Sequence, residues 1–282
     1  MKFSDLLSVF TVTLLLTSCS YGDDEIFNVG VSQCSQDEWR DKMNAEMQRE
    51  AMLSHEITLE IRSANDDSRK QKEDIAYFID KKVDLLIVSP NEAGEVTPAV
   101  DEAFDAGIPV VVVDRNVTGD KYTAFISADN VQIGYMQGQY VAGNLRPGEK
   151  VIEIKGLTGS TPAMERHDGF IAGLGDAGVE IVASIDAEWS SDLACQLTDS
   201  LLRIYPDVSM IVGPSDPRAN GAYRAAEARY PRNEIKFIGV DALPGKGLGV
   251  EAIINGQLDA SRLYPTGGDV VIQTALKILQ RR

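Results

Sequence analysis

Short apolar runs rich in β-branched residues alternate, from residue 26 onward, with longer stretches of helical period. This alternation is typical of βαβ units and predicts a parallel sheet. The strands expected in the first series are 27–32, 57–61, 85–89, 110–114 and 125–127. The helices expected with them are 37–53, 68–82, 95–106 and 130–144. Ser68 is placed to cap the second helix, and Gly107 followed by Pro109 ends the third.

The alternation restarts after a turn at Pro147-Gly148. The second series predicts strands at 151–154, 180–184, 210–212, 237–240 and 258–263. Its expected helices are 161–177, 191–204, 218–229 and 244–255, followed by a final helix at 267–281. Two such series predict an α/β fold of two similar doubly wound parallel-sheet lobes joined by a hinge, which suits a chain of 282 residues. We assign residues 26–127 and 265–282 to the N-terminal lobe and 128–264 to the C-terminal lobe.

Residues 1–25 have a different pattern, because Lys2 precedes an apolar run at 6–16. The run is shorter than the ~20 residues of a membrane-spanning helix but typical of a secretory signal. It ends in Leu16-Thr17-Ser18-Cys19, which resembles the lipobox of bacterial lipoproteins. We therefore expect export to the periplasm or cell envelope, with a lipid tether at Cys19. An uncleaved anchor or plain secretion is the alternative.

The formal net charge of −16 argues against nucleic-acid partners, because phosphates are bound through Lys and Arg. Anionic membrane surfaces are disfavoured for the same reason. Cys34 and Cys195 fall in different lobes and are predicted to be free thiols. The two histidines, His55 and His167, have no metal-ligand spacing with other residues, so neither a metal nor a cofactor is expected.

Polar residues recur where the expected strands end, which is where open parallel sheets bind their ligands. They are Ser32, Ser89, Asp114 with Arg115, Ser127 with Asp129 and Asn130, Ser215 with Asp216, and Asp241. Each alone suits a turn or a helix cap, but together they favour a ligand site. Carboxylate and guanidinium groups make strong hydrogen bonds to hydroxyls. Trp39 and Trp189 offer apolar faces to the C–H side of a sugar ring, although each also suits ordinary packing.

Enzyme motifs are mostly missing. Gly245-Lys246 lacks the preceding glycine and the following Ser or Thr of a phosphate-binding loop, and no Gly-x-Ser-x-Gly elbow is present. A carboxylate pair drawn from Asp114, Asp129, Asp216 and Asp241 leaves a glycosidase-like hydrolase open.

From 27 to 282 the chain resembles the type I periplasmic sugar-binding proteins of the ribose-binding family. The markers are Ala106-Gly107-Ile108-Pro109-Val110, Val113-Asp114-Arg115, Ser127-Ala128-Asp129-Asn130, Glu165-Arg166-His167-Asp168-Gly169-Phe170, Gly239-Val240-Asp241, Asn255-Gly256-Gln257-Leu258 and Tyr264-Pro265-Thr266-Gly267-Gly268. The resemblance implies that Asp114, Arg115, Arg166 and Asp241 bind ring hydroxyls. Ser89 and Ser215 stand where the family often has Asn, Trp39 where it has an aromatic residue, and Tyr264 near a family Gln.

Two departures from the family pattern matter. The loop Ser32-Gln33-Cys34-Ser35-Gln36-Asp37-Glu38-Trp39 is more acidic than usual, which makes a ligand other than ribose plausible. The resemblance also implies a third interlobe crossover and a final strand, yet the chain ends at Arg281-Arg282 with only two crossings expected, near 127–129 and 263–265. Such an ending fits the sensor domain of a hybrid two-component histidine kinase.

The function expected is therefore binding of a monosaccharide of the pentose or ketohexose class, without chemistry on it. Occupancy would pass to a membrane permease or to a histidine kinase. The alternatives are a LacI-type ligand-binding regulator, which needs a DNA-binding segment before the first strand, and the hydrolase.

Overall fold

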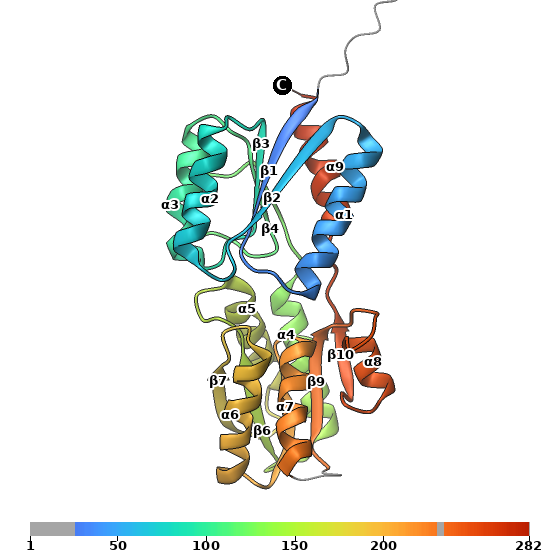
Figure 1. Ribbon diagram of the computed structural model, residues 1–282. Coiled ribbons are helices and arrows are strands. Elements are labelled where there is room, and N and C mark those ends of the chain that lie inside the picture. Colours follow the sequence, from blue (N-terminus) through green and yellow to red (C-terminus); the bar gives the residue numbers. More distant parts are fainter. Residues whose placement is uncertain (1–25, 230–233, 282) are drawn as a thin grey trace, which may run out of the picture.

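The computed structural model describes residues 26–229 and 234–281. It consists of two lobes stacked end to end, each built on its own five-stranded sheet (Figure 1). All strand pairs are parallel, so the predicted fold class is confirmed. The expected export segment, with Cys19, lies outside the described residues.

The first lobe has the strand order β2-β1-β3-β4-β5. Its strands are β1 (Phe27–Gln33), β2 (Ile57–Ser63), β3 (Leu85–Val88), β4 (Val110–Val113) and β5 (Ala124–Ile126). Its helices are α1 (Glu38–Ser54), α2 (Ser68–Asp80), α3 (Ala93–Asp105) and, from the far end of the chain, α9 (Gly268–Leu279). Strands β3 and β4 are built only of buried Leu, Ile and Val because α1 and α9 cover one sheet face and α2 and α3 the other (Figure 1).

The second lobe has the order β10-β9-β8-β6-β7. Its strands are β6 (Lys150–Lys155), β7 (Glu180–Asp186), β8 (Val208–Val212), β9 (Lys236–Asp241) and β10 (Ala260–Leu263). Its helices are α4 (Asn130–Asn144), α5 (Thr161–Leu174), α6 (Ser191–Ile204), α7 (Asp216–Arg229) and α8 (Gly249–Ile254). Helices α4 and α5 pack on one face of the sheet, and α6 and α7 on the other.

Several predicted boundaries are wrong for local reasons. The helix expected at 244–255 is confined to Gly249–Ile254, because Gly245 and Gly247 have φ angles of 139° and 77°, which a helix excludes. Helix α5 ends at Leu174, where Gly175 leaves the helical conformation. Ser68 does not cap α2. That position belongs to Asp67, whose carboxylate accepts from the backbone N–H of Arg69 and Lys70.

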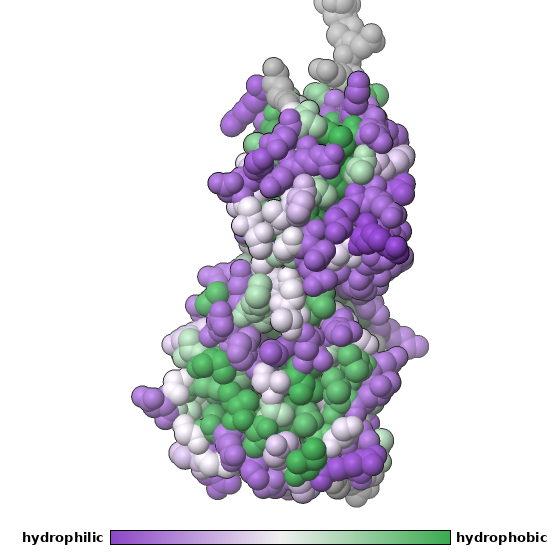
Figure 2. Space-filling model, turned by 90° about the vertical axis from the view of Figure 1, so that its left-hand side faces the viewer, coloured by the Kyte–Doolittle hydropathy of each residue, from purple (hydrophilic) through white to green (hydrophobic). Residues whose placement is uncertain are grey.

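Within the described residues, the chain passes between the lobes twice, between β5 and α4 and between β10 and α9. Hydrogen bonds also join the two lobes directly, away from these connecting segments. The amide of Ala93 donates to Gly159 O at 2.9 Å, and the amide of Asn116 donates to Thr161 Oγ1 at 2.9 Å. Figure 2 shows the narrow waist between the lobes. On the face seen there, hydrophobic residues cover more of the second lobe than of the first. Within residues 26–229 and 234–281, no helix is both long and apolar enough to cross a membrane.

Candidate functional site

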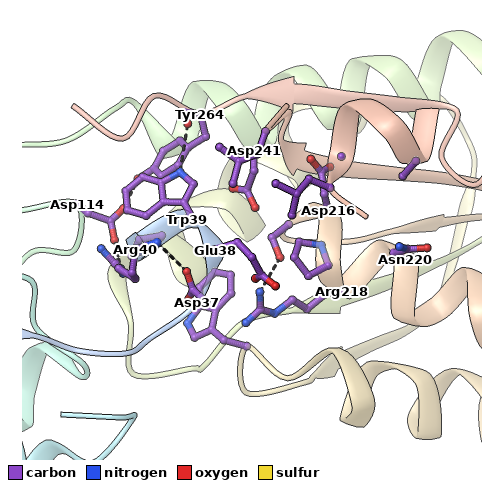
Figure 3. A pocket seen from close by; sticks show the side chains of 18 of the residues that line it. Asp37, Glu38, Trp39, Arg40, Asp114, Asp216, Arg218, Asn220, Asp241 and Tyr264 are labelled. Carbon is purple, nitrogen blue, oxygen red and sulfur yellow. Dashed lines mark hydrogen bonds and ion pairs between the residues drawn. The ribbon is translucent and has the colours of Figure 1, made fainter. Parts of the chain in front are cut away.

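A cavity of about 70 Å³ lies between the lobes, lined by charged and aromatic side chains from both (Figure 3). The principal contributors from the first lobe are Asp37, Trp39, Arg40, Asp114 and Arg115. Those from the second lobe are Arg166, Trp189, Ser215, Asp216, Arg218 and Asp241, with Tyr264 on the second connecting segment.

Asp114 is held in a tight turn directly after β4. Its φ of 62° is fixed by two hydrogen bonds: its amide donates to Ile126 O and its carbonyl accepts from Ser127 Oγ, both at 2.8 Å. Its carboxylate accepts from the Arg40 guanidinium and from the Tyr264 hydroxyl. Burial opposes ionisation of Asp114, but the charges of Arg40 and Arg115 outweigh it and hold its pKa below the ordinary value. Asp114 is therefore an ionised acceptor at the cavity wall.

Two aromatic rings form the wall beside Asp114. Trp39 and Tyr264 stack with ring centroids 5.2 Å apart, and Trp39 Nε1 donates to Tyr264 O at 3.2 Å. The Arg166 guanidinium lies 4.4 Å from the centre of the Tyr264 ring. Burial, followed by the Asp114 charge, raises the pKa of Tyr264 above its ordinary value. Tyr264 is thus a neutral hydroxyl that links the two lobes at their second connection.

Arg166 and Arg115 are oriented by neutral oxygens. Arg166 Nε donates to Asn130 Oδ1 at 2.9 Å, and a terminal nitrogen donates to Pro214 O. Arg115 donates to Asn91 O at 3.0 Å and to Asn91 Oδ1 at 3.3 Å. Arg115 Nε also lies 4.0 Å from Asp114 Oδ2, so its charge is partly balanced within the protein. Arg166 is held by uncharged groups and therefore keeps most of its attraction for oxygen atoms in the cavity.

Trp189 lies at the centre of a group of arginines. The guanidinium carbons of Arg115, Arg166 and Arg218 are 5.5, 5.9 and 5.7 Å from its ring centre, within the range of cation–π attraction. Its Nε1 donates to Ser160 Oγ at 3.1 Å, which fixes the indole plane. The ring therefore presents a positioned aromatic surface to the cavity.

Two buried carboxyl groups face the cavity from the second lobe. Burial raises the pKa of Asp216 to about 6, and burial together with the nearby Asp216 raises the pKa of Asp241 well above its ordinary value. Asp216 Oδ2 accepts from the Ala242 amide at 2.8 Å, while its Oδ1 has no hydrogen-bond partner among the described residues. Figure 3 shows both carboxyl groups across the cavity from Asp114.

The structure brings together most of the residues that the sequence predicted. Eight line the cavity: Trp39, Asp114, Arg115, Arg166, Trp189, Ser215, Asp241 and Tyr264. Ser32, Ser89 and Asp129 lie outside this lining. Ser32 and Ser89 are fully buried at the ends of their strands, and the carbonyls of both accept from Gln71. Asp129 is exposed and caps α4 by accepting from the Gln132 amide at 2.8 Å, so local capping explains its position.

Sequence reasoning missed Arg40, Arg218 and Asn220, and Asp37 entered it only as part of an acidic loop. All four line the cavity from the beginning of a helix. Asp37 and Arg40 lie at the start of α1, and Arg218 and Asn220 at the start of α7. A usable signal was present, because a helix that follows a strand in a βαβ unit begins at the ligand-binding edge of the sheet. Burial lowers the pKa of Arg218, whose Nε has no partner among the described residues.

In the part of the chain that the structure describes, thiols and carboxylates do not form a metal-ion site. No group of three or more His, Cys, Asp or Glu residues there is placed to hold a metal ion. Cys34 is buried, Cys195 is half-buried, and both are free thiols, as predicted.

Comparison with known proteins gives consistent results. The chain is 31% identical over 198 residues to the ribose import binding protein RbsB of Escherichia coli strain K12, and 30% identical over 178 residues to that of Bacillus subtilis strain 168. These matches cover 70% and 63% of this chain but only 66% and 57% of the two relatives, which is less than two thirds of each.

Among solved structures, the fructose-binding periplasmic domain of the hybrid two-component system BT1754 is 48% identical, with a TM-score of 0.89. The match covers 91% of this chain and 86% of that domain. A family model described as a periplasmic binding protein domain matches residues 29–282. With two parallel-sheet lobes and a cavity between them, this chain belongs to the periplasmic binding protein domain family.

Proposed function

We propose that this protein binds a monosaccharide of the pentose or ketohexose class in the cell envelope and closes its lobes around it. The observation that carries the proposal is the convergence of charged side chains from both lobes on one cavity. Asp114 and Arg115 approach from the first lobe, and Arg166 and Asp241 from the second. A ligand that touches both lobes favours the closed arrangement, so binding becomes a conformational signal.

The chemistry of the lining suits a neutral polyol. Asp114 supplies an ionised acceptor, whereas Arg115 and Arg166 supply donors. Trp189 supplies an apolar face for the C–H side of a ring. The names of the relatives, a ribose import binding protein and a fructose-binding domain, support the same ligand class.

Export and tethering are part of the proposal. Membership of a periplasmic binding protein family supports export, and the segment ending at Cys19 supports a lipid anchor. Replacement of Cys19 by Ser, with metabolic lipid labelling of both forms, tests the anchor. Absence of lipid on the unaltered protein would exclude it.

The downstream partner is a sugar importer or a membrane sensor kinase. The relatives include an import binding protein and a domain of a two-component system, so both partners have support. Deletion of the gene distinguishes them, since an importer component is needed for uptake of labelled sugar, whereas a sensor is needed for sugar-dependent transcription. A LacI-type regulator is disfavoured by the net charge of −16.

A thermal-shift screen of pentoses and ketohexoses tests the central proposal. At a ligand concentration of one hundred times Kd, binding stabilises by about 2.7 kcal/mol, which corresponds to a rise in Tm of about 5–10 °C. Asp114→Ala should weaken binding at least about tenfold, because it removes a charged acceptor from buried hydroxyls. Asp120→Ala, an exposed aspartate of the same lobe, is the matched control and should bind normally.

The screen also has contrary outcomes. Absence of any Tm shift with millimolar pentoses and ketohexoses would refute the proposal. Hydrolysis of a disaccharide during incubation, with product scaling with protein, would instead favour the hydrolase alternative, for which Asp216 and Asp241 are the available carboxyl pair.

A further inference from the structure

A second, larger cavity opens directly outside the first. Its volume is about 430 Å³, and it also lies between the lobes. Ser35 and Asp66 line it from the first lobe, and Ser191 and Arg224 line it from the second. Asp37, Trp189 and Arg218 are among the residues that border both cavities, so the two are compartments of one cleft. We refer to them as the inner and the outer compartment.

Trp189 and Arg218 form the boundary between the compartments. Arg115 and Arg166 border only the inner compartment, whereas Arg218 borders both and lies 5.7 Å from the Trp189 ring centre. Figure 3 shows Arg218 and Asn220 on the side of the cavity away from Asp114 and Tyr264. A sugar bound against Asp114 therefore has the Trp189–Arg218 boundary on the side that leads outward.

Polar atoms at this boundary are unsatisfied. Arg218 Nε and Asn220 Oδ1 are shielded from solvent and have no hydrogen-bond partner among the described residues. Arg218 donates to Ser215 Oγ at 3.4 Å and lies over the Trp189 ring, but among the described residues it forms no ion pair. A buried donor or acceptor left unpaired costs about 1–3 kcal/mol. At the boundary between the compartments, the Arg218 Nε donor and the Asn220 Oδ1 acceptor are therefore available to a ligand.

The outer compartment is also lined by groups that bind hydroxyls. Arg224 is fixed by Ser191 Oγ and Asp192, each 3.1 Å from one of its terminal nitrogens. Burial raises the pKa of Asp66, which faces the compartment from the other lobe. A group bound here touches both lobes, so it would favour closure in the same way as a sugar in the inner compartment.

We propose that the outer compartment is a subsite for a substituent on the bound sugar, so that the ligand class includes furanosides and disaccharides as well as the free monosaccharide. The inference rests on the proposed function, because the inner compartment must first hold the sugar ring. Arg218 and Asn220 pair with the linking oxygen and its neighbouring hydroxyl. Arg224 and Asp66 contact the substituent itself.

Calorimetry on matched sugars tests the subsite. D-ribose is compared with methyl β-D-ribofuranoside, and D-fructose with methyl β-D-fructofuranoside and sucrose. In whichever series the free sugar binds, the protein should bind the substituted sugars at least as tightly as the free sugar. Arg224→Ala should weaken binding of the disaccharide about tenfold and leave binding of the free sugar within about twofold. Arg146→Ala, an exposed arginine of the same lobe, is the control and should change neither.

The contrary outcomes separate this inference from the proposed function. If the free sugar binds and every substituted sugar binds at least about one hundredfold more weakly, the outer compartment is only the mouth of the cleft and the inference is overturned. Equal losses for free and substituted sugars in Arg224→Ala would also overturn it. If neither free nor substituted sugars bind, the proposed function fails as well.

Discussion

Asp216 shows how the position of a single side chain sets a pH response. Burial raises its pKa to about 6 from an ordinary 3.8, so between these values the folded protein holds a proton that the unfolded chain releases. Stability from this group is therefore complete below about pH 3.8 and is lost as the pH rises through about 6. The difference of roughly 2 between these two pKa values corresponds to about 3 kcal/mol of unfolding free energy.

Asp216→Asn, which cannot ionise, should remove this loss. Relative to the parent protein, the variant should gain up to about 3 kcal/mol of unfolding free energy as the pH rises from 4 to 7. Urea unfolding at a series of pH values measures the difference. Asp120→Asn, at an exposed position, is the control and should give a flat difference. A flat difference for Asp216→Asn too would show that burial does not perturb this carboxyl.

The pairing of α4 with α5 positions Arg166 through backbone contact. A Cβ atom at Gly134 would lie 2.0 Å from Arg166 O, and one at Gly169 would lie 2.0 Å from Val131 O. The two helices therefore touch through glycines, and a methyl group can enter only if they separate. The backbone carbonyl of Arg166, on α5, is the atom that Gly134 of α4 lies against. The spacing of the two helices therefore decides how far the Arg166 guanidinium reaches into the cavity.

Gly134→Ala should destabilise the protein by about 1–3 kcal/mol, as overpacking of a close interface does, and should also weaken sugar binding by displacing Arg166. Gly143→Ala on the same helix has nothing within 4 Å and should be neutral or stabilise by roughly 0.5–1 kcal/mol. Chemical unfolding and calorimetry measure the two effects. Equal behaviour of the two variants would contradict the role given to the helix contact.

The lobes are also held together outside the cavity. The Asn116 amide of the first lobe donates to Thr161 Oγ1 of the second at 2.9 Å, and neither residue lines the inner compartment. Such a bond forms only when the lobes are close together. It therefore favours the closed arrangement without contacting the sugar.

Thr161→Val should weaken sugar binding about fivefold, because one hydrogen bond of about 1 kcal/mol is lost from the closed arrangement alone. Small-angle scattering should then show less compaction at subsaturating sugar. Thr58→Val, at an exposed position on β2, is the matched control and should change neither quantity. Unchanged affinity in Thr161→Val would show that the interlobe bond does not contribute to closure.

The sequence by itself determined the alternation of strands and helices, since buried runs such as Val110–Val113 and capped amphipathic helices are local patterns. It also placed polar residues at the strand ends, and eight of the eleven predicted site residues line one cavity. Only the tertiary structure decided which strand-end residues turn inward. Asp114 and Asp129 look alike in sequence, yet one reaches Arg40 across the lobe and the other caps its own helix.

The partners of the remaining site residues also come from distant parts of the chain. Arg40 meets Asp114, and Trp39 stacks on Tyr264, across separations that no sequence pattern encodes. The late start of α8 is a different case, because Gly245 and Gly247 take positive φ angles for local reasons. Local patterns fix the elements through short-range sterics and burial. The approach of the two lobes then fixes the site, because its chemistry depends on side chains that become neighbours only when the lobes meet.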